Sequence, residues 1–397
     1  MEKRRHNTQT WRNAVFIVFL VNGLSFSTWL ARVPAIRDGL GLSTGEVATL
    51  LFTGAIGAVS GLIFSSHIVA WIGQRNTIVV FGLLGLLGLA GIGLSSEILS
   101  SYALTAVSIV AAGAGNGIAD VAMNVEGAQV ERAIGRMIMP WFHALWSLGT
   151  VSGAGLAALV SFLGIGLAPH ALVIAFVAGA TLLTLPRFLL GDAERTASTS
   201  EKPMTLGERL GVWREPRTVA IGLIALGMAF AEGSANDWLA LAIVDGRDAS
   251  NAIGALWFGF FTAGMMAGRI GGVWVLDRFG RVPVLQASAG LAILGLALVI
   301  MVSQPVVSGV GALLWGIGSS LGFPVAMSAA ADDVRGSAAR VSAVATLAYG
   351  AFLIGPPLIG GVGEAIGLLA ALWAVVLLIL VAFFASPAAS PTKTASP

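Results

Sequence analysis

Long apolar segments alternate with short polar ones along the chain, and this alternation predicts membrane-spanning helices. Crossing the hydrocarbon core of a bilayer takes about 20 apolar residues in a helix. Twelve segments meet that length, six on each side of a polar stretch at 190–217. The predicted spans are 14–33, 45–68, 77–96, 101–127, 140–163, 169–189, 218–243, 251–275, 282–302, 306–330, 341–362 and 366–385.

The polar stretch sets the predicted domain boundaries. We expect an N-terminal six-helix bundle at 1–189, a cytoplasmic linker at 190–217 and a C-terminal six-helix bundle at 218–386. The tail at 387–397 is poor in apolar residues and is predicted to be disordered.

Weak internal repeats indicate that the two predicted bundles are related. Matching residues recur 204 to 209 positions apart and join corresponding helices. The matches are Gly57, Gly61 and Gly73 with Gly264, Gly268 and Gly280; Trp29-Leu30-Ala31 with Trp238-Leu239-Ala240; and Val121-Ala122-Met123 with Val325-Ala326-Met327. Two like-oriented repeats are typical of secondary transporters. The sequence therefore predicts an all-α integral membrane protein with 12 transmembrane helices in two pseudo-symmetric bundles.

Composition agrees with this fold class and excludes several functions. Of the 397 residues, 11% are charged, against about 25% in soluble domains, and the mean hydropathy is +0.89. The chain lacks cysteine, which excludes disulfides and thiolate metal sites. It also lacks a GxxxxGK[ST] phosphate loop and an HExxH pair, so we expect neither an enzyme nor a cofactor nor a metal.

Positive charge indicates the orientation in the membrane. All but three of the 22 Lys and Arg lie on the side that holds both predicted termini, and the exceptions are Arg32, Arg37 and Arg247. Cytoplasmic loops carry such an excess, so we expect both termini in the cytoplasm of a bacterial cell with a multi-pass protein in its inner membrane. The sequence has a basic pI of about 9.4. The excess of basic residues on the cytoplasmic side accounts for this value, so we expect no nucleic acid as a partner.

The segment GRIGGVWVLDRFGRVPVL, after the eighth predicted helix, resembles the cytoplasmic signature of the major facilitator superfamily, G-x-x-x-D-R-x-G-R. The matching residues are Asp277, Arg278, Gly280 and Arg281. The leading glycine stands one place early, at Gly272. The first-half copy, SSHIVAWIGQR, has Ala70 and Trp71 in place of the acid and the arginine. The resemblance covers essentially the whole chain and implies the major facilitator fold and transport by alternating access.

The fourth predicted helix resembles that of the fucose-type proton symporters, which carry an acid four residues before an asparagine, as Asp120 and Asn124 do. The segments GNGIADVAMNVEGAQVER and FHALWSLG look closest to a small bacterial branch that includes the membrane protein of rhizopine loci. This resemblance implies a small polyhydroxylated cargo, sugar- or inositol-like, that is coupled to protons. We expect a monomer whose partners are this solute, protons and the lipid bilayer.

Asp120 is the predicted proton carrier. It lies about one helical turn from both Asn116 and Asn124, so the three share a face, and nearby glycines at Gly113 and Gly115 predict close approach of another helix. A carboxylate inside a membrane helix costs at least ~2.5 kcal/mol and normally faces a bundle interior or an aqueous cavity. A structural role as partner of a helix-end charge is the alternative.

Three further groups are candidates for assisting proton transfer: Glu126, His143 and Glu232. His143 is predicted at a level comparable with that of Asp120, and histidine titrates near neutrality, although a structural histidine is an equal alternative. Glu232 lies deep in the seventh predicted helix.

Aromatic and amide side chains predict where the solute binds. Flat indole faces suit the apolar face of a sugar or cyclitol ring, and amides hydrogen-bond hydroxyls. The candidates are Asn22, Trp29, Asn116, Asn124, Trp146, Asn236, Trp238 and Trp315. For the tryptophans, placement in an interfacial aromatic belt is the alternative.

Charged residues near helix ends are predicted to control conformational change. They are Arg32, Asp237, Asp277, Arg278, Arg281 and Arg340. We expect Asp277 to face Arg340 or the N-terminal end of the eleventh helix, and Asp332 and Asp333 to face Arg278 and Arg281. A pair between Arg32 and Asp237 would close an outer gate, unless both side chains simply extend to the interface.

Two other functions stay open at this point. A drug or metabolite exporter would have a large apolar cavity, but the fourth-helix arginine of many drug/proton antiporters has no counterpart between Ser108 and Asn124. A membrane sensor with a transporter-like fold would explain the degraded first-half motif, yet it has no need for Asp120, Glu232 and Asp237.

The topology is testable because the chain contains no cysteine. A single cysteine that replaces Thr199 should react with a membrane-impermeant maleimide only after the cells are opened, since the linker is expected in the cytoplasm. Labelling from outside intact cells would contradict the predicted orientation.

Overall fold

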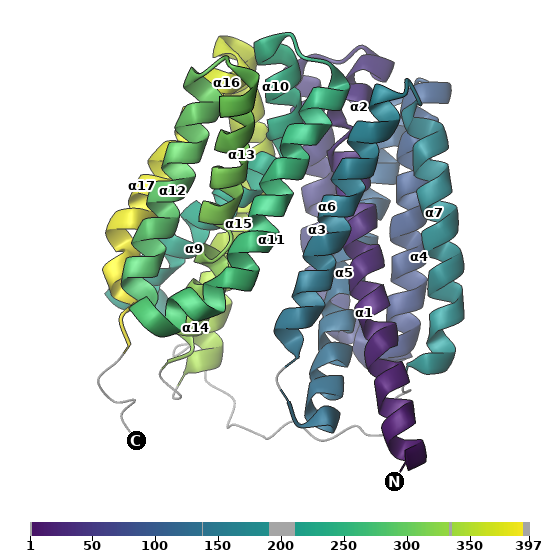
Figure 1. The fold of residues 1–397 in the computed structure, drawn as a ribbon, viewed down its shortest axis with the longest axis vertical. Helices are drawn as coiled ribbons and strands as arrows, with labels where there is room; N and C mark the ends of the chain where they lie inside the picture. The colour runs from purple at the N-terminus through teal and green to yellow at the C-terminus, as the bar shows by residue number, and fades with distance from the viewer. Residues whose placement is uncertain (1, 137, 190–210, 333–335, 392–397) are drawn as a thin grey trace. The chain divides into compact units, whose positions relative to one another are not determined.

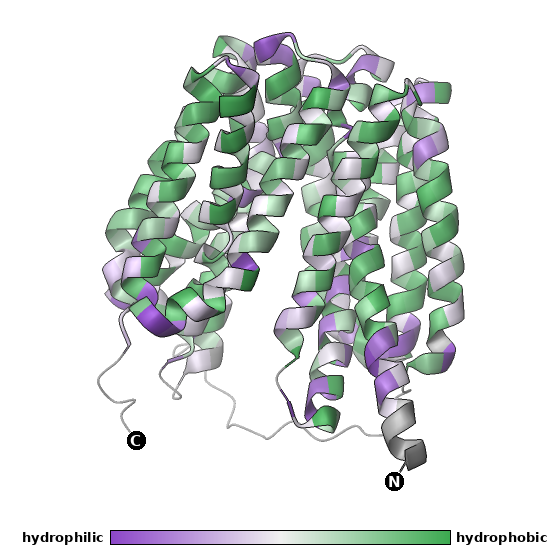
Figure 2. Ribbon diagram, viewed as in Figure 1, coloured by the Kyte–Doolittle hydropathy of each residue, from purple (hydrophilic) through white to green (hydrophobic). Residues whose placement is uncertain are grey.

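The computed structural model describes residues 2–136, 138–189, 211–332 and 336–391. Throughout these ranges the regular secondary structure is helical, without a β-strand. Twelve helical stretches are long and apolar enough to cross a membrane, which confirms the predicted fold class. Apolar residues cover most of the length of these helices, and hydrophilic residues gather at helix ends (Figure 2).

The first six predicted spans correspond to helices of the N-terminal half (Figure 1). These are α1 (Glu2–Leu30), α2 (Val33–Leu40), α3 (Thr44–Ile72), α4 (Gln74–Gly93), η1 (Leu94–Ile98), α5 (Tyr102–Ile134), α6 (Met139–Phe162), α7 (Leu167–Thr184) and η2 (Leu185–Phe188).

The other six correspond to helices of the C-terminal half. These are η3 (Val212–Arg214), α9 (Pro216–Ser234), η4 (Ala235–Leu239), α10 (Ala240–Arg247), α11 (Asn251–Phe279), α12 (Arg281–Met301), α13 (Pro305–Ser319), α14 (Gly322–Ala330), α15 (Ser337–Ile366), α16 (Leu368–Ala371), α17 (Trp373–Ala385) and η5 (Ser386–Ala389).

The helices differ from the predicted segments in several places, among them the π-helical end of the third span, η1, and the break of the twelfth into α16 and α17. The first begins at Glu2, and the seventh contains the π-helical turn η4 between α9 and α10. The tenth is broken into α13 and α14. The tail, predicted as disordered from 387, begins with the 3-10 helix η5, in which Ala389 is buried. Residues 190–210 of the predicted linker and 392–397 of the tail lie outside the described residues.

Internal contacts divide the chain into two compact units. Unit 1 comprises Met1–Arg195 and Leu239–Gly259, and unit 2 comprises Thr196–Trp238 and Phe260–Pro397. In unit 1, α5 packs against α3 and α4, α1 against α6, and α4 against α7. In unit 2, α12 packs against α13, and α9 against α15 and α17. Segment 239–259 falls in unit 1, although the sequence assigned it to the C-terminal bundle. The predicted domain boundaries stay a prediction.

Contacts with α2 account for the place of segment 239–259 in unit 1. Arg37, on α2, forms an ion pair with Asp245 on α10. Next to it, Asn251 donates a hydrogen bond of 3.0 Å to Asp38. These polar contacts hold α10 and the start of α11 against α2.

Glycines bring α5 into backbone contact with both of its neighbours. A Cβ atom on Gly113 would collide with the backbone of Gly54 on α3, and one on Gly115 would collide with Gly85 on α4. Small residues allow such close approach within membranes, where it strengthens van der Waals packing. The close approach predicted from the glycines of this helix is confirmed.

Two glycine linkers show that the sequence repeat is also a repeat of backbone conformation. Gly73 joins α3 to α4 with φ 81° and ψ 161°. Gly280, 207 positions later, joins α11 to α12 with φ 77° and ψ 171°. Residues with a side chain rarely adopt this conformation, so glycine is required at both turns.

The close packing of α4 and α5 gives a testable prediction. Gly115→Ala should lower the thermal unfolding midpoint of the purified protein, since overpacking typically costs about 1–3 kcal/mol. The control is Gly155→Ala on α6, where the added Cβ has nothing within 4 Å. Equal midpoints for the two variants would contradict the role assigned to Gly115.

Candidate substrate and proton site

A chain of three polar side chains crosses the interior of unit 1. The Nδ2 atom of Asn22, on α1, donates to Oδ1 of Asn116 on α5 at 3.1 Å. The Oδ1 atom of Asn22 accepts from Nε1 of Trp146, on α6, at 3.0 Å. Gly23 lies against the backbone of Trp146, which lets α1 and α6 approach closely enough for this bond. Three of the predicted substrate-binding residues are thus brought together from three helices.

Asp120 lies one turn beyond Asn116 on α5 and is half-buried. The amide of Asn124 donates to the backbone carbonyl of Asp120 at 2.9 Å, along the axis of its own helix. The amide oxygen of Asn116 is occupied by Asn22. Asp120 is thus about 6 Å of helix from the Asn116 end of the Asn22–Asn116–Trp146 chain, and Asn124 is its hydrogen-bond partner on the same helix.

Glu126 is fully buried and accepts a hydrogen bond of 2.6 Å from Nε1 of Trp11 on α1. This bond ties α1 to α5, and the predicted role of Glu126 in proton transfer stays a prediction. Sequence reasoning missed Trp11, because nothing in the local pattern links residues 115 positions apart. His143 is exposed on α6, with its ring edge-to-face against Phe19 at 5.5 Å between centroids.

Arg32 is buried between α1 and α2, and its Nη2 donates to the carbonyl of Ile165 at 3.1 Å. Burial lowers the pKa of its guanidinium, and the charge of Glu97 opposes that effect. Glu97 in turn accepts a hydrogen bond of 2.5 Å from the backbone N–H of Ala168 at the start of α7. These contacts make Arg32 a structural link within unit 1; its predicted role in gating stays a prediction.

The predicted tryptophans of unit 2 are enclosed by protein. Trp238 and Trp315 are both 0% exposed, and Trp315 packs edge-to-face against Phe261 at 5.4 Å. Their ring faces are therefore covered, which does not favour stacking of a sugar in this conformation. Trp29, in unit 1, is also buried, and Asn236 and Asp237 are half-buried in η4.

Glu232 on α9 pairs with Arg269 on α11, with 3.2 Å between Oε1 and Nη2. The charge count of the sequence placed Arg269 at a helix end on the cytoplasmic side. That placement is wrong, because Arg269 lies ten residues, about 15 Å of helix, from the end of α11 at Phe279. Without Arg269, 18 Lys and Arg still stand on the predicted cytoplasmic side against three on the other, so the topology argument keeps its direction.

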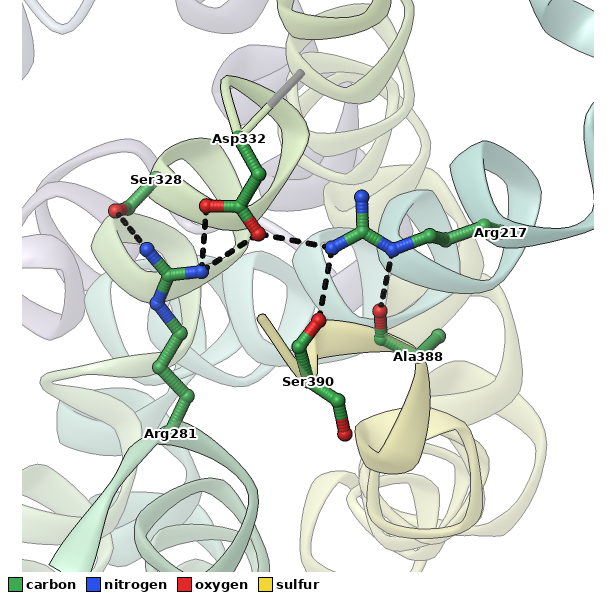
Figure 3. Close-up of polar contacts among 6 residues, drawn as sticks. All are labelled: Arg217, Arg281, Ser328, Asp332, Ala388 and Ser390. Atoms are coloured by element: carbon green, nitrogen blue, oxygen red, sulfur yellow. Dashed lines mark hydrogen bonds and ion pairs between the residues drawn. The ribbon is translucent and has the colours of Figure 1, made fainter. Parts of the chain in front are cut away.

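Arg281 and Asp332 form a salt bridge at the start of α12, as predicted. The Nη1 atom of Arg281 lies 2.7 Å and 2.8 Å from the two carboxylate oxygens (Figure 3). Arg217, at the start of α9, reaches the same carboxylate at 2.9 Å and also donates to two carbonyls near the C-terminus. The further partners in this cluster are Ser328 at 3.0 Å, Ala388 at 3.1 Å and Ser390 at 3.0 Å.

The first-half counterpart of this salt bridge is neutral. Gln74 precedes Arg281 by 207 positions, and its Oε1 accepts a hydrogen bond of 2.9 Å from Nε2 of Gln129 on α5. An amide pair therefore joins the α3–α4 turn to α5, where unit 2 uses opposite charges.

Asp277, Arg278 and Arg340, the other predicted gating residues near the α11–α12 turn and at the start of α15, have neighbours that differ from those predicted. Asp277 is exposed and makes no ion pair within the described ranges, and Arg278 stacks on the ring of Phe279. Arg340 pairs instead with Glu215, at 2.6 Å, so the expected Asp277–Arg340 contact is not formed. This bond to Arg340 is the main cause that lowers the pKa of the Glu215 carboxyl. Asp333 lies outside the described residues.

Comparison with known proteins identifies relatives over nearly the whole chain. The family model described as Major Facilitator Superfamily matches residues 125–356. An uncharacterized transporter of Sinorhizobium fredii, y4wD, is 31% identical over 92% of this chain and 96% of its own length. The membrane protein MosC of Rhizobium meliloti is 26% identical over 89% of this chain and 84% of its own length.

Solved structures share the fold. A point variant of the nucleoside transporter NupG matches with a TM-score of 0.78 at 14% identity, over 96% of this chain and 100% of NupG. A D-xylose-proton symporter matches with a TM-score of 0.71 at 14% identity, over 97% of this chain and 98% of its own. At such identities the likeness establishes the fold alone.

The Glu215–Arg340 pair predicts a pH-dependent contribution to stability. Because the folded-state pKa of Glu215 is lowered, the pair stabilises the protein above the ordinary value of 4.5 and ceases to do so as pH falls through the folded pKa. Arg340→Gln should therefore lower the unfolding midpoint at pH 7 by a small amount, corresponding to at most about 1 kcal/mol for this partly exposed pair. The difference from the parent protein should shrink at acid pH. Arg278→Gln, which removes an equal charge, should show no such pH dependence, and identical behaviour of both variants would contradict the assignment.

Proposed function

Because the chain belongs to the Major Facilitator Superfamily, we propose that it is a proton-coupled secondary transporter of a small polyhydroxylated solute, sugar- or inositol-like. It works by alternating access, as a monomer, in the inner membrane of a bacterium with both termini in the cytoplasm. Membership of the family, shown by the match over 125–356 and by the relatives, supports transport itself.

The class of solute rests on the side chains around Asn22. An amide both donates and accepts hydrogen bonds, which suits hydroxyl groups that also do both. Asn22 already uses its amide in this way, since it donates to Asn116 and accepts from Trp146. A sugar or cyclitol hydroxyl would exchange with these bonds without leaving a polar group unpaired. A large apolar drug would not, and this contrast favours the polyhydroxylated cargo.

Asp120 supplies the proton site of the proposal. It is a carboxyl group in a membrane-spanning helix, one turn from the Asn22–Asn116 bond, so a proton and a hydroxyl-bearing solute would bind next to each other. Interdependent binding at two adjacent sites couples their occupancies. The solved structures with this fold include a fucose:proton symporter and a D-xylose-proton symporter, which supports proton coupling here by analogy.

Proteoliposomes test this proposal. A thermal-shift panel of sugars, cyclitols and nucleosides first selects a solute that binds the purified protein. In vesicles with an imposed pH gradient, Asp120→Asn should abolish accumulation of that solute, because an amide cannot carry a proton. Exchange of labelled for unlabelled solute should persist, since it needs no net proton movement.

Glu126→Gln is the matched comparison, because it keeps the oxygen that accepts from Trp11. It should accumulate solute normally. Undiminished accumulation by Asp120→Asn would exclude Asp120 as the proton carrier. Loss of accumulation in Glu126→Gln alone would transfer that role to Glu126.

A further inference from the structure

An arginine lies deep within the helices of unit 2, where a charge is costly. Arg269 stands 18 residues from the start of α11 and ten from its end, about 27 Å and 15 Å of helix. Its partner Glu232 stands 16 residues, about 24 Å, from the start of α9. Ionisable side chains at such depth are rare and usually mark the path of a solute or an ion.

The contact between these two charges is loose. The distance of 3.2 Å exceeds the ~2.7–2.9 Å that is usual for charge-assisted hydrogen bonds. The Arg281–Asp332 salt bridge of the same unit is shorter, at 2.7 Å. The side chains of Arg269 and Glu232 also keep 23% and 19% of their surface exposed. The guanidinium is thus held by Glu232 and still accessible to another group.

Buried polar atoms of α9 and α13 lie at neighbouring levels. Gly322 packs against Met228, which sets the register of the two chain segments. Counted at 1.5 Å per residue from Met228, Glu232 and Ser234 lie about 6 Å and 9 Å along α9, and Ser319 ends α13 just before the break that precedes Gly322. Gly268, next to Arg269, packs against Ser320 on the same stretch of unit 2.

Four buried polar atoms in this region have no hydrogen-bond partner among the residues that the structure describes. They are Oγ of Ser234, Nε1 of Trp238, Nε1 of Trp315 and Oγ of Ser319. Each serine lies four residues from one of the tryptophans, which places the two on one face of their helix. Native proteins rarely leave buried polar groups unpaired, so these atoms indicate a partner that comes from outside the chain, either water or a solute.

We propose that Arg269 binds the carboxylate of an acidic polyhydroxylated solute, such as a uronate or an aldonate, and that Glu232 occupies the guanidinium while the solute is absent. This inference rests on the proposed transport function and adds to it the charge of the cargo. A guanidinium and an indole N–H only donate hydrogen bonds, and a serine hydroxyl also donates. A guanidinium therefore suits a carboxylate, which only accepts, better than it suits a neutral polyol. The planar guanidinium also fits a carboxylate with two parallel bonds.

Calorimetric titration of the full-length protein in detergent tests the inference with two pairs of probes. D-glucuronate is compared with D-glucose, and D-gluconate with D-glucitol, so that each pair differs mainly in the carboxylate. The parent protein should bind the acids more tightly than their neutral counterparts. Arg269→Gln should weaken acid binding roughly 10- to 100-fold, as expected for the loss of a hydrogen bond to a charged group, and should leave neutral binding unchanged.

Glu232→Gln distinguishes competition from a structural role. If Glu232 competes with the solute for Arg269, its removal should tighten acid binding. If Glu232 only supports the fold, its removal should weaken binding of acids and neutral solutes alike. Arg269→Lys keeps the positive charge but lacks the planar guanidinium, so it should lose part of the affinity for acids. This variant replaces Arg269→Gln in the test if Arg269→Gln does not fold. Arg136→Gln, exposed after the end of α5, is the control for loss of charge.

Several outcomes would overturn the inference. Equal affinity for D-glucose and D-glucuronate, or binding of the neutral probes alone, would refute it and leave the proposed transport of polyhydroxylated solutes intact. Equal weakening of acids and neutral solutes by Arg269→Gln, or weaker acid binding in Glu232→Gln, would assign the pair a structural role. If none of the four probes binds while apolar drugs do, both the inference and the proposed function are wrong.

Discussion

The cost of placing charge among apolar helices shapes the polar structure of both units. A carboxylate or guanidinium in such surroundings needs a partner that replaces water. Glu126 is fully buried and is held by Trp11, and Glu232 is held by Arg269. At the start of α9 and α12, Asp332 is shared by two arginines (Figure 3). The helices can remain apolar over most of their length because these few groups are partnered.

The same constraint distinguishes carboxyl groups that can exchange their hydrogen-bond partner from carboxyl groups that hold two helices together. The Glu126 bond is short, at 2.6 Å, and the group is inaccessible, so it stabilises the contact between α1 and α5. Glu232 is partly exposed and its contact is longer, so its bond is easier to exchange. Asp120 is half-buried beside an amide chain that can itself exchange hydrogen bonds. Distance and exposure together separate these three acids, whereas the sequence presents them alike.

The sequence predicts the spans and their repeat well, because hydropathy over 20 residues and glycine at a tight turn are local properties. Gly73 and Gly280 were matched from the sequence and adopt the same conformation. Asn22, Asn116 and Trp146 were each proposed from residue type, yet their mutual bonds depend on packing between three helices. Arg269 was misplaced because an arginine in a span near a charged turn looks like a helix-end residue. Its partner is 37 positions away, and no local pattern reveals it.

The α3–α4 turn of unit 1 and the α11–α12 turn of unit 2 have the same backbone conformation. The side-chain bonds that stabilise the two turns differ in strength. Hydrogen bonds between charged groups are roughly twice as strong as those between neutral ones. The α11–α12 turn is fixed by Arg281 to Asp332, which also binds Arg217 and through it the C-terminal carbonyls of Ala388 and Ser390. In the α3–α4 turn, the corresponding position holds the amide pair of Gln74 and Gln129. Gln74, in place of a residue like Arg281, therefore has a physical consequence: this turn is tied to α5 by a bond between neutral groups, which is weaker and less sensitive to salt.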